Sequence, residues 1–251
     1  MARKRIIAGN WKMNMTPSEA VKLVEELKPL VVNDDVDVVY CVPAIDIVPV
    51  VEAVKGTNVQ VGAENFYIED KGAYTGEISA PMLVDAGVKY VIIGHSERRE
   101  YFKEDDAFLN KKVKKAIASG LTPILCCGET LEQREMGVTM DWIRLQIKSD
   151  LAGVAAADVA NMVIAYEPIW SIGPGKTPAG KDYITKIARF VKEQTGGMDI
   201  VYGGGLKQDN AAMLASIDEI DGGLIALTRF QGEIGYYPEE YLEIIRLYMG
   251  K

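Results

Sequence analysis

The sequence has little cysteine, a single histidine and no excess of positive charge, and these shortages argue against particular classes of structure and of binding partner. Its 251 residues include three cysteines, at Cys41, Cys126 and Cys127, and this odd number with an adjacent pair does not form a disulfide framework. We therefore expect a reducing compartment and inert core thiols. The net charge of −8 argues against binding to nucleic acid or acidic membranes, which requires a basic surface.

Long hydrophobic runs are also missing from the sequence. No apolar stretch approaches the length of a membrane span, and the basic N-terminus, Met1 to Asn10, has an apolar run too short for a signal peptide. We therefore expect a cytoplasmic protein. The length fits one (β/α)8 domain but would also fit two small domains. Because no proline- or serine-rich linker divides the chain, we expect a single domain over residues 1–251.

Short apolar runs alternate with helical patterns along the whole chain. Eight of these runs are expected to be strands: Ile6–Gly9, Val38–Val42, Val59–Ala63, Tyr90–Ile93, Thr122–Cys126, Met162–Tyr166, Ile200–Tyr202 and Gly223–Leu227. The helices expected between them include Ser18–Leu30, Asp105–Ser119, Met140–Ala152, Lys181–Gln194, Asp209–Ala215 and Glu239–Tyr248. Thr16 and Pro17 mark a helix start, since hydroxyl caps and first-turn prolines are typical there.

The expected strands indicate an α/β protein with a parallel sheet. Most of them are nearly continuous apolar runs, which is typical of parallel strands buried on both faces. Strand–helix alternation indicates βαβ units, and eight repeats favour a closed (β/α)8 barrel, a TIM barrel. An open, doubly wound sheet remains the alternative, because alternation alone does not distinguish the two.

Polar residues that directly follow strands are the first candidates for function, because the C-terminal strand ends of a barrel converge on one mouth. Lys12 follows the first strand, His95 the fourth and Glu167 the sixth. His95 precedes a plausible helix start at Ser96, whose positive end would lower the imidazole pKa and favour the neutral ring. Glu167 has apolar neighbours, so we expect a raised pKa that suits a general base.

Glycine-rich turns follow the sixth and seventh strands, at residues 173–175 and 203–205. Their N–H groups can bind an anion, whereas the Gly-x-Gly-Lys sequence ending at Lys176 lacks the spacing of an ATP-binding P-loop. Taken singly, each signal has an ordinary explanation, such as a solvated lysine, a structural histidine or an exposed glutamate. A base, a neutral electrophile, a cation and an anion site together suggest enolisation of a small phosphorylated carbonyl compound.

Six blocks, in order along nearly the whole chain, resemble motifs of the triosephosphate isomerase family. They are Gly9–Asn14, Gly72–Glu77, Ile93–Arg99, Cys126–Thr130, Ala165–Trp170 and Tyr202–Gly204. The resemblance implies an aldose–ketose isomerase of glycolysis and gluconeogenesis. It would interconvert dihydroxyacetone phosphate and glyceraldehyde 3-phosphate without a metal or organic cofactor. It also implies a homodimer, in which the loop around Thr75 reaches into the second subunit.

The same resemblance assigns roles to single residues. Glu167 would move a proton between the two carbons, His95 would polarise the oxygens of the enediol(ate), and Lys12 would stabilise their negative charge. Asn10 would hydrogen-bond the substrate oxygen. Supporting residues would be Ser96 and Glu97, the latter packing behind Lys12, and residues 169–177 would form a lid that excludes water. The phosphate would be held by the backbone N–H groups of Gly173, Gly205, Ala226 and Leu227.

Some positions depart from the family, all near the expected phosphate end. Gly205 stands where serine is usual, and Pro174 stands in the lid where threonine is usual. Ala226 and Leu227 replace a Gly-Gly pair; both keep an N–H group, but Leu227 would be strained if the backbone there requires positive φ. The stretch that follows is longer than usual, and Arg229 within it is a candidate compensating cation for the phosphate.

These departures leave three alternatives open. The chain could be an isomerase of a different sugar phosphate, such as a four-carbon ketose phosphate. It could be a catalytically silent barrel that binds a phosphometabolite, although binding alone needs no base, and Lys12, His95 and Glu167 are all present. A cofactor-dependent enzyme on the same barrel is disfavoured, because no residue cluster for a metal or Schiff base is apparent.

Overall fold

The computed structural model describes residues 5–31, 33–173, 175–226 and 238–249. Its strands are β1 (Arg5–Asn10), β2 (Val36–Val42), β3 (Gln60–Ala63), β4 (Tyr90–Ile93), β5 (Thr122–Cys127), β6 (Val163–Tyr166), β7 (Asp199–Tyr202) and β8 (Gly222–Ala226). They follow the expected runs closely, with differences of at most two residues at either end, and Leu227, the expected end of the eighth strand, lies outside the described residues.

The strands form one closed barrel in sequential order from β1 to β8, and every pairing is parallel. Ile7 of β1 lies opposite Val38 of β2 on one side and Gly223 of β8 on the other. Pairing of β1 with β8 closes the sheet. The predicted TIM barrel is therefore confirmed, and the alternative of an open, doubly wound sheet is excluded.

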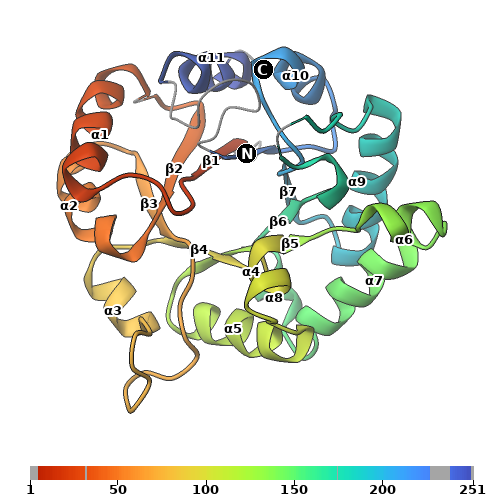
Figure 1. Ribbon diagram of the computed structural model, residues 1–251, viewed down its shortest axis with the longest axis horizontal. Helices are drawn as coiled ribbons and strands as arrows, with labels where there is room; N and C mark the ends of the chain where they lie inside the picture. The colour runs from red at the N-terminus through yellow and green to blue at the C-terminus, as the bar shows by residue number, and fades with distance from the viewer. Residues whose placement is uncertain (1–4, 32, 174, 227–237, 250–251) are drawn as a thin grey trace.

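Helices surround the barrel, as Figure 1 shows. They are α1 (Pro17–Val31), α2 (Ile47–Ala53), α3 (Ala80–Asp85), α4 (Ser96–Tyr101), α5 (Asp106–Ala118), α6 (Leu131–Glu135), α7 (Thr139–Asp150), α8 (Ala156–Val159), α9 (Lys181–Thr195), α10 (Gln208–Ala215) and α11 (Pro238–Met249). Short 3-10 helices occupy Ala44–Asp46 and Ile169–Ser171. Among the described residues, no helix has the length and apolarity needed to cross a bilayer.

The expected start of α1 is confirmed by a local hydrogen-bond pattern. The backbone N–H and the hydroxyl of Thr16 both donate to the carboxylate of Glu19, at 2.8 and 2.9 Å. Pro17 then occupies the first helical position, where a backbone N–H would have no acceptor within the helix, so proline costs no hydrogen bond there. The sequence signal for this helix boundary therefore had a direct physical basis.

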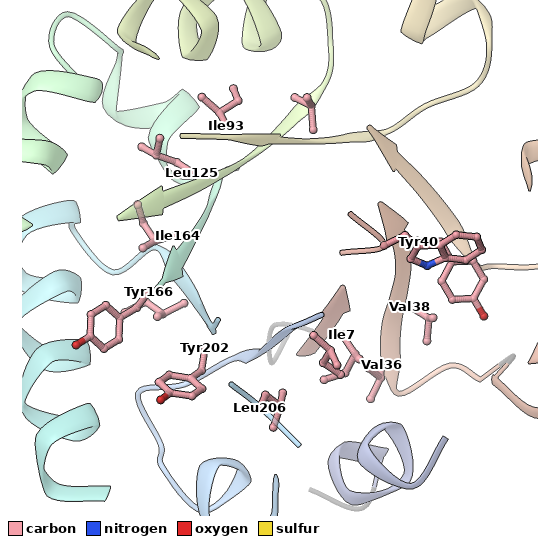
Figure 2. Packing of buried hydrophobic residues seen from close by; sticks show 14 of the residues in the cluster. Ile7, Val36, Val38, Tyr40, Ile93, Leu125, Ile164, Tyr166, Tyr202 and Leu206 are labelled. Atoms are coloured by element: carbon pink, nitrogen blue, oxygen red, sulfur yellow. The ribbon is translucent and has the colours of Figure 1, made fainter. Parts of the chain in front are cut away.

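The apolar core has two layers, separated by the strands. One cluster consists of strand residues alone, among them Ile6, Ala8, Cys41 and Cys126, and fills the barrel interior. The alternate positions, such as Ile7, pack outward against the helices; part of this larger cluster is drawn in Figure 2. Strands buried on both faces explain why the sequence has continuous apolar runs rather than alternation.

Candidate active site

The predicted polar residues meet in one pocket, formed at the C-terminal ends of the strands. The pocket is lined by Asn10, Lys12, His95, Glu167, Ile172, Gly203, Gly205, Leu224 and Ala226. These residues end or directly follow β1, β4, β6, β7 and β8, apart from Ile172, which follows the 3-10 helix Ile169–Ser171, and Leu224 within β8. The barrel therefore gathers residues that are far apart in sequence.

Lys12 is held in an unusual backbone conformation just after β1. Its φ of 54° lies in the left-handed region, which non-glycine residues rarely adopt and which costs about 1–3 kcal/mol. The side-chain oxygen of Asn10 accepts a hydrogen bond from the Lys12 N–H at 3.1 Å and so supports this turn. The Lys12 ammonium forms an ion pair with the Glu97 carboxylate, which matches the expected packing of Glu97 behind Lys12.

His95 is the N-cap residue of α4, so the same ring serves the helix and the pocket. Its Nδ1 accepts a hydrogen bond from the backbone N–H of Glu97 at 3.2 Å. A nitrogen that accepts cannot carry the proton, so the neutral ring has its proton on Nε2. Nε2 lies 3.0 Å from Oε1 of Glu167 and is positioned to donate to it.

Glu167 is buried and fixed through both its backbone and its side chain. Its backbone N–H donates to the carbonyl of Cys127 at 2.8 Å, and Oε2 accepts from the N–H of Ser96 at 3.1 Å. Gly128 permits this close approach, because a Cβ there would lie 1.7 Å from the carbonyl oxygen of Glu167. Glu167 is therefore not the exposed loop residue that the sequence left open.

The contact between His95 and Glu167 reverses both pKa shifts that we expected from the sequence. Burial by itself raises the pKa of Glu167, but the pKa is lowered overall, because the His95 ring and the Ser96 N–H stabilise the carboxylate. Burial lowers the pKa of His95, but contact with the Glu167 carboxylate raises it overall. The predictions of a depressed histidine pKa and a raised glutamate pKa were therefore wrong for the paired arrangement.

A buried carboxylate anchors the segment that follows β6. Glu129 accepts hydrogen bonds from the hydroxyl of Tyr166 at 3.2 Å, from Nε1 of Trp170 at 2.7 Å and from the hydroxyl of Tyr183 at 2.8 Å. Its carbonyl also accepts from the N–H of Ile169 at 3.0 Å. This cluster holds the first residues of the expected lid against β6 and α9.

Some of the residues predicted to bind the phosphate line the pocket, and others do not. Gly205 and Ala226 line the pocket, whereas Gly173 does not and its neighbour Ile172 does. The Gly205 carbonyl accepts a hydrogen bond from the side chain of Asn210 at 3.0 Å, which fixes the turn after β7. Leu227, Arg229 and Pro174 lie outside the described residues.

Sequence reasoning missed three contributors to this site. Ile172 and Leu224 line the pocket as apolar residues, and nothing in the sequence distinguishes them from core residues. Glu129 belonged to a block that resembled the family, but its donors lie 37, 41 and 54 residues further along the chain, beyond the reach of local pattern.

Among the described residues, no group of three or more His, Cys, Asp or Glu side chains is arranged to hold a metal ion.

Comparisons with known proteins agree with this geometry. A family model described as triosephosphate isomerase matches residues 5–246. The triosephosphate isomerase of Clostridium novyi (strain NT) is 53% identical over 232 residues, covering 89% of this chain and 92% of the relative. That of Caldanaerobacter subterraneus subsp. tengcongensis is 50% identical over 251 residues, covering 97% and 99%. The crystal structure of triosephosphate isomerase from Bartonella henselae has a TM-score of 0.85 at 31% identity, covering 98% and 99% of the two chains.

These matches extend over almost the whole chain and therefore include every strand that contributes to the pocket. They support the interpretation as an aldose–ketose isomerase of triose phosphates, and they give no support to the four-carbon alternative or to a silent barrel. The resemblance of the six sequence blocks is thus confirmed: the chain belongs to the triosephosphate isomerase family.

Proposed function

We propose that the protein interconverts dihydroxyacetone phosphate and glyceraldehyde 3-phosphate, a reaction of glycolysis and gluconeogenesis, with Glu167 as the base and His95 as the electrophile. The observation that carries this proposal is the 3.0 Å contact between Nε2 of His95 and the Glu167 carboxylate, in one pocket with Lys12. A buried base beside a ring N–H is what proton transfer next to a carbonyl requires. The pairing of a glutamate base with a neutral histidine is the known chemistry of this family.

The reaction follows from what each group can do. Glu167 takes a proton from the carbon next to the carbonyl, the C–H electron pair forms the C=C bond, and negative charge moves to the carbonyl oxygen. The Nε2–H of His95 and the ammonium of Lys12 face that oxygen and stabilise the charge, and Asn10 orients it. His95 then gives its Nε2 proton to that oxygen and takes the proton of the neighbouring hydroxyl. Glu167 returns its proton to the other carbon: the C=C electron pair forms the new C–H bond, and the deprotonated oxygen becomes the new carbonyl. The proposal requires no metal or organic cofactor.

Substrate binding is expected to change the protonation balance of the catalytic pair. A substrate oxygen that binds Nε2 of His95 displaces the Glu167 carboxylate, the group whose contact raises the histidine pKa. Burial and the nearby Lys12 then remain and lower that pKa, against a smaller raising contribution from Glu97. We therefore expect substrate binding to lower the pKa of His95, which favours the neutral ring with its proton on Nε2.

The phosphate is proposed to bind where the turn after β7 and the end of β8 line the pocket. The supporting observation is that Gly205 and Ala226 line the pocket, and both carry backbone N–H groups. Gly173 and Leu227 complete this set in our proposal, with residues 169–177 as the lid. Arg229 as a second cation remains a prediction.

A homodimer is proposed on the basis of surface chemistry. Met13 is 97% exposed, and Tyr101 and Phe102 are 68% and 65% exposed, which is unusual for side chains next to an active site. Met13, Tyr101 and Phe102 line a hollow of about 670 Å³, together with Lys12 and His95 of the pocket. The loop between β3 and α3, which contains the exposed Thr75, projects beyond the ring of helices (Figure 1) and would fill this hollow in a second copy.

Two further parts of the proposal concern the domain organisation of the chain and its location in the cell. Closure of the barrel by β1 and β8 supports one domain over residues 1–251, because elements from both ends of the sequence share one sheet. A cytoplasmic location is supported by the three cysteines, which are all free.

The decisive experiment is a steady-state assay on both triose phosphates and on four-carbon ketose phosphates. A kcat/KM for trioses near the diffusional ceiling, about 10⁸ M⁻¹s⁻¹, would support the proposal. A preference for a four-carbon substrate would overturn it. Solvent deuterium exchange into the substrate, with Glu167→Gln as control, tests the base separately, because exchange should require the carboxylate.

A further inference from the structure

Arg99 occupies a position in the structure that the proposed reaction does not explain. It lies in α4, four residues after His95, and its side chain is 16% exposed. The guanidinium turns back toward the barrel: Nε donates to the Gly94 carbonyl at 2.8 Å, and Nη2 donates to the Cys126 carbonyl at 3.3 Å. One side chain thereby connects the residue after β4 to the end of β5.

Two carboxylates from other helices hold the guanidinium in place. Nη2 donates to Oδ2 of Asp150, at the end of α7, at 2.7 Å, and Asp150 is fully buried. Nη1 donates to the carboxylate of Asp106, the first residue of α5. Contacts in four directions from one planar group need the fork of donors that arginine has and lysine lacks.

Both backbone segments that Arg99 connects lead directly to the catalytic pair. Gly94 precedes His95 and has a φ of 73°, a left-handed conformation that turns its carbonyl toward the guanidinium. Cys126 precedes Cys127, whose carbonyl accepts the N–H of Glu167 at 2.8 Å. One side of the guanidinium therefore sets the His95 peptide, and the other sets the strand end to which Glu167 is attached.

We propose that Arg99, held by Asp106 and Asp150, is a positioning residue that fixes the relative placement of His95 and Glu167. Arg99 does not line the pocket and touches no reacting atom, so its effect passes through the Gly94 and Cys126 carbonyls. The inference rests on the proposed isomerase function. A displacement of about 1 Å between reacting groups lowers a rate about 100-fold, so a clamp of this kind acts on kcat.

The first test is Arg99→Lys, which keeps the charge and removes the fork. We expect kcat to fall about 10- to 100-fold while KM changes little, because no substrate contact is lost. Arg189→Lys is the matched control, since Arg189 forms an ion pair with Glu219 but is 67% exposed and does not line the pocket. Its kcat should equal that of the wild type.

A second readout uses the fact that His95 is the only histidine in the sequence. In protein labelled with 15N-histidine, the two ring nitrogens give one pair of signals, which report the tautomer and the hydrogen bond from Glu97 to Nδ1 directly. We expect a single Nε2–H tautomer in the wild type and in Arg189→Lys at high pH. In Arg99→Lys, the signals should shift or broaden as the ring loses its fixed orientation, a change that general destabilisation of a still-folded protein does not cause.

The outcomes separate the inference from the function on which it rests. If the wild type does not isomerise triose phosphates, the proposed function fails, and the ring signals of the variant still decide the positioning role. If the wild type is active and folded Arg99→Lys keeps both its kcat and its ring signals, the positioning role is refuted. If Arg99→Lys does not fold, Asp106→Asn, at a partly exposed position, should change both readouts in the same direction by a smaller factor. No change in either readout there refutes the inference equally.

Discussion

Replacement of Glu64 by glutamine is expected to stabilise the protein at neutral pH and to remove part of its pH dependence. Glu64 directly follows β3, and among the described residues its Oε1 is buried without a hydrogen-bond partner. The pKa of this carboxyl is raised to about 8, mainly by burial and also by the Glu97 and Asp46 carboxylates, against a lowering contribution from Lys12. Glutamine has the shape of the protonated acid and does not ionise.

The sign and size of the effect follow from proton linkage. The folded-state pKa, about 8, lies above the unfolded value of 4.5, so between these values only the unfolded chain releases the proton. The stability of the wild type is therefore fully present below pH 4.5 and is lost as the pH rises toward 8. At pH 7, roughly 2.5 pH units above the unfolded pKa, the free energy of unfolding has fallen by about 3 kcal/mol. The Glu64→Gln variant does not incur this loss.

Thermal unfolding at fixed protein concentration, measured at about pH 5 and about pH 7.5, tests this reasoning. The variant should exceed the wild type clearly at the higher pH and much less at the lower pH; at pH 7 the difference corresponds to a midpoint shift of about 6–12 °C. Glu52→Gln is the control, since Glu52 is exposed on α2 and should show no pH-dependent gain. An advantage of Glu64→Gln that is equal at both pH values would refute the assignment of the effect to ionisation.

Three further predictions follow from contacts at the site. Glu167→Asp withdraws the carboxylate by about 1 Å, so kcat should fall about 100-fold with little change in KM; a kcat near that of the wild type would contradict its role as base. Trp170→Phe removes the 2.7 Å donor to Glu129 and should lower stability by about 1–3 kcal/mol in urea unfolding. Gly128→Ala places a Cβ against the Glu167 carbonyl and should lower both activity and stability, the latter by about 3 kcal/mol, in the same assays.

The barrel could be predicted from the sequence because its signals are local. Each strand is a short, continuous apolar run, and the long helices such as α1, α5 and α9 are amphipathic over several turns. Short helices such as α3 (Ala80–Asp85) and α6 (Leu131–Glu135) were not predicted, since five or six residues span too few turns to show a period. Closure of the sheet was an inference from the number of repeats, and only the pairing of β1 with β8 established it.

The site divides in the same way between local and distant causes. Lys12, His95 and Glu167 could be found because each directly follows a strand, and the barrel brings those ends together. Their pKa shifts could not be found, because the contact that reverses them joins side chains more than 70 residues apart. His95 does lie at the start of α4, where its Nδ1 accepts a hydrogen bond from the first turn, as the expected lowering of its pKa requires. The Glu167 carboxylate, 3.0 Å from Nε2, outweighs this effect.

The adjacent cysteines on β5 make the two layers of the core separately observable. Cys126 faces the barrel interior and Cys127 faces the helices, and both are buried. Burial raises the pKa of both thiols, so hardly any thiolate exists at neutral pH while the strands remain closed. An alkylating reagent can react only with molecules that have opened transiently. The order in which these two neighbouring thiols are modified then records whether the helices detach before the barrel interior is exposed, or whether both layers open in one step.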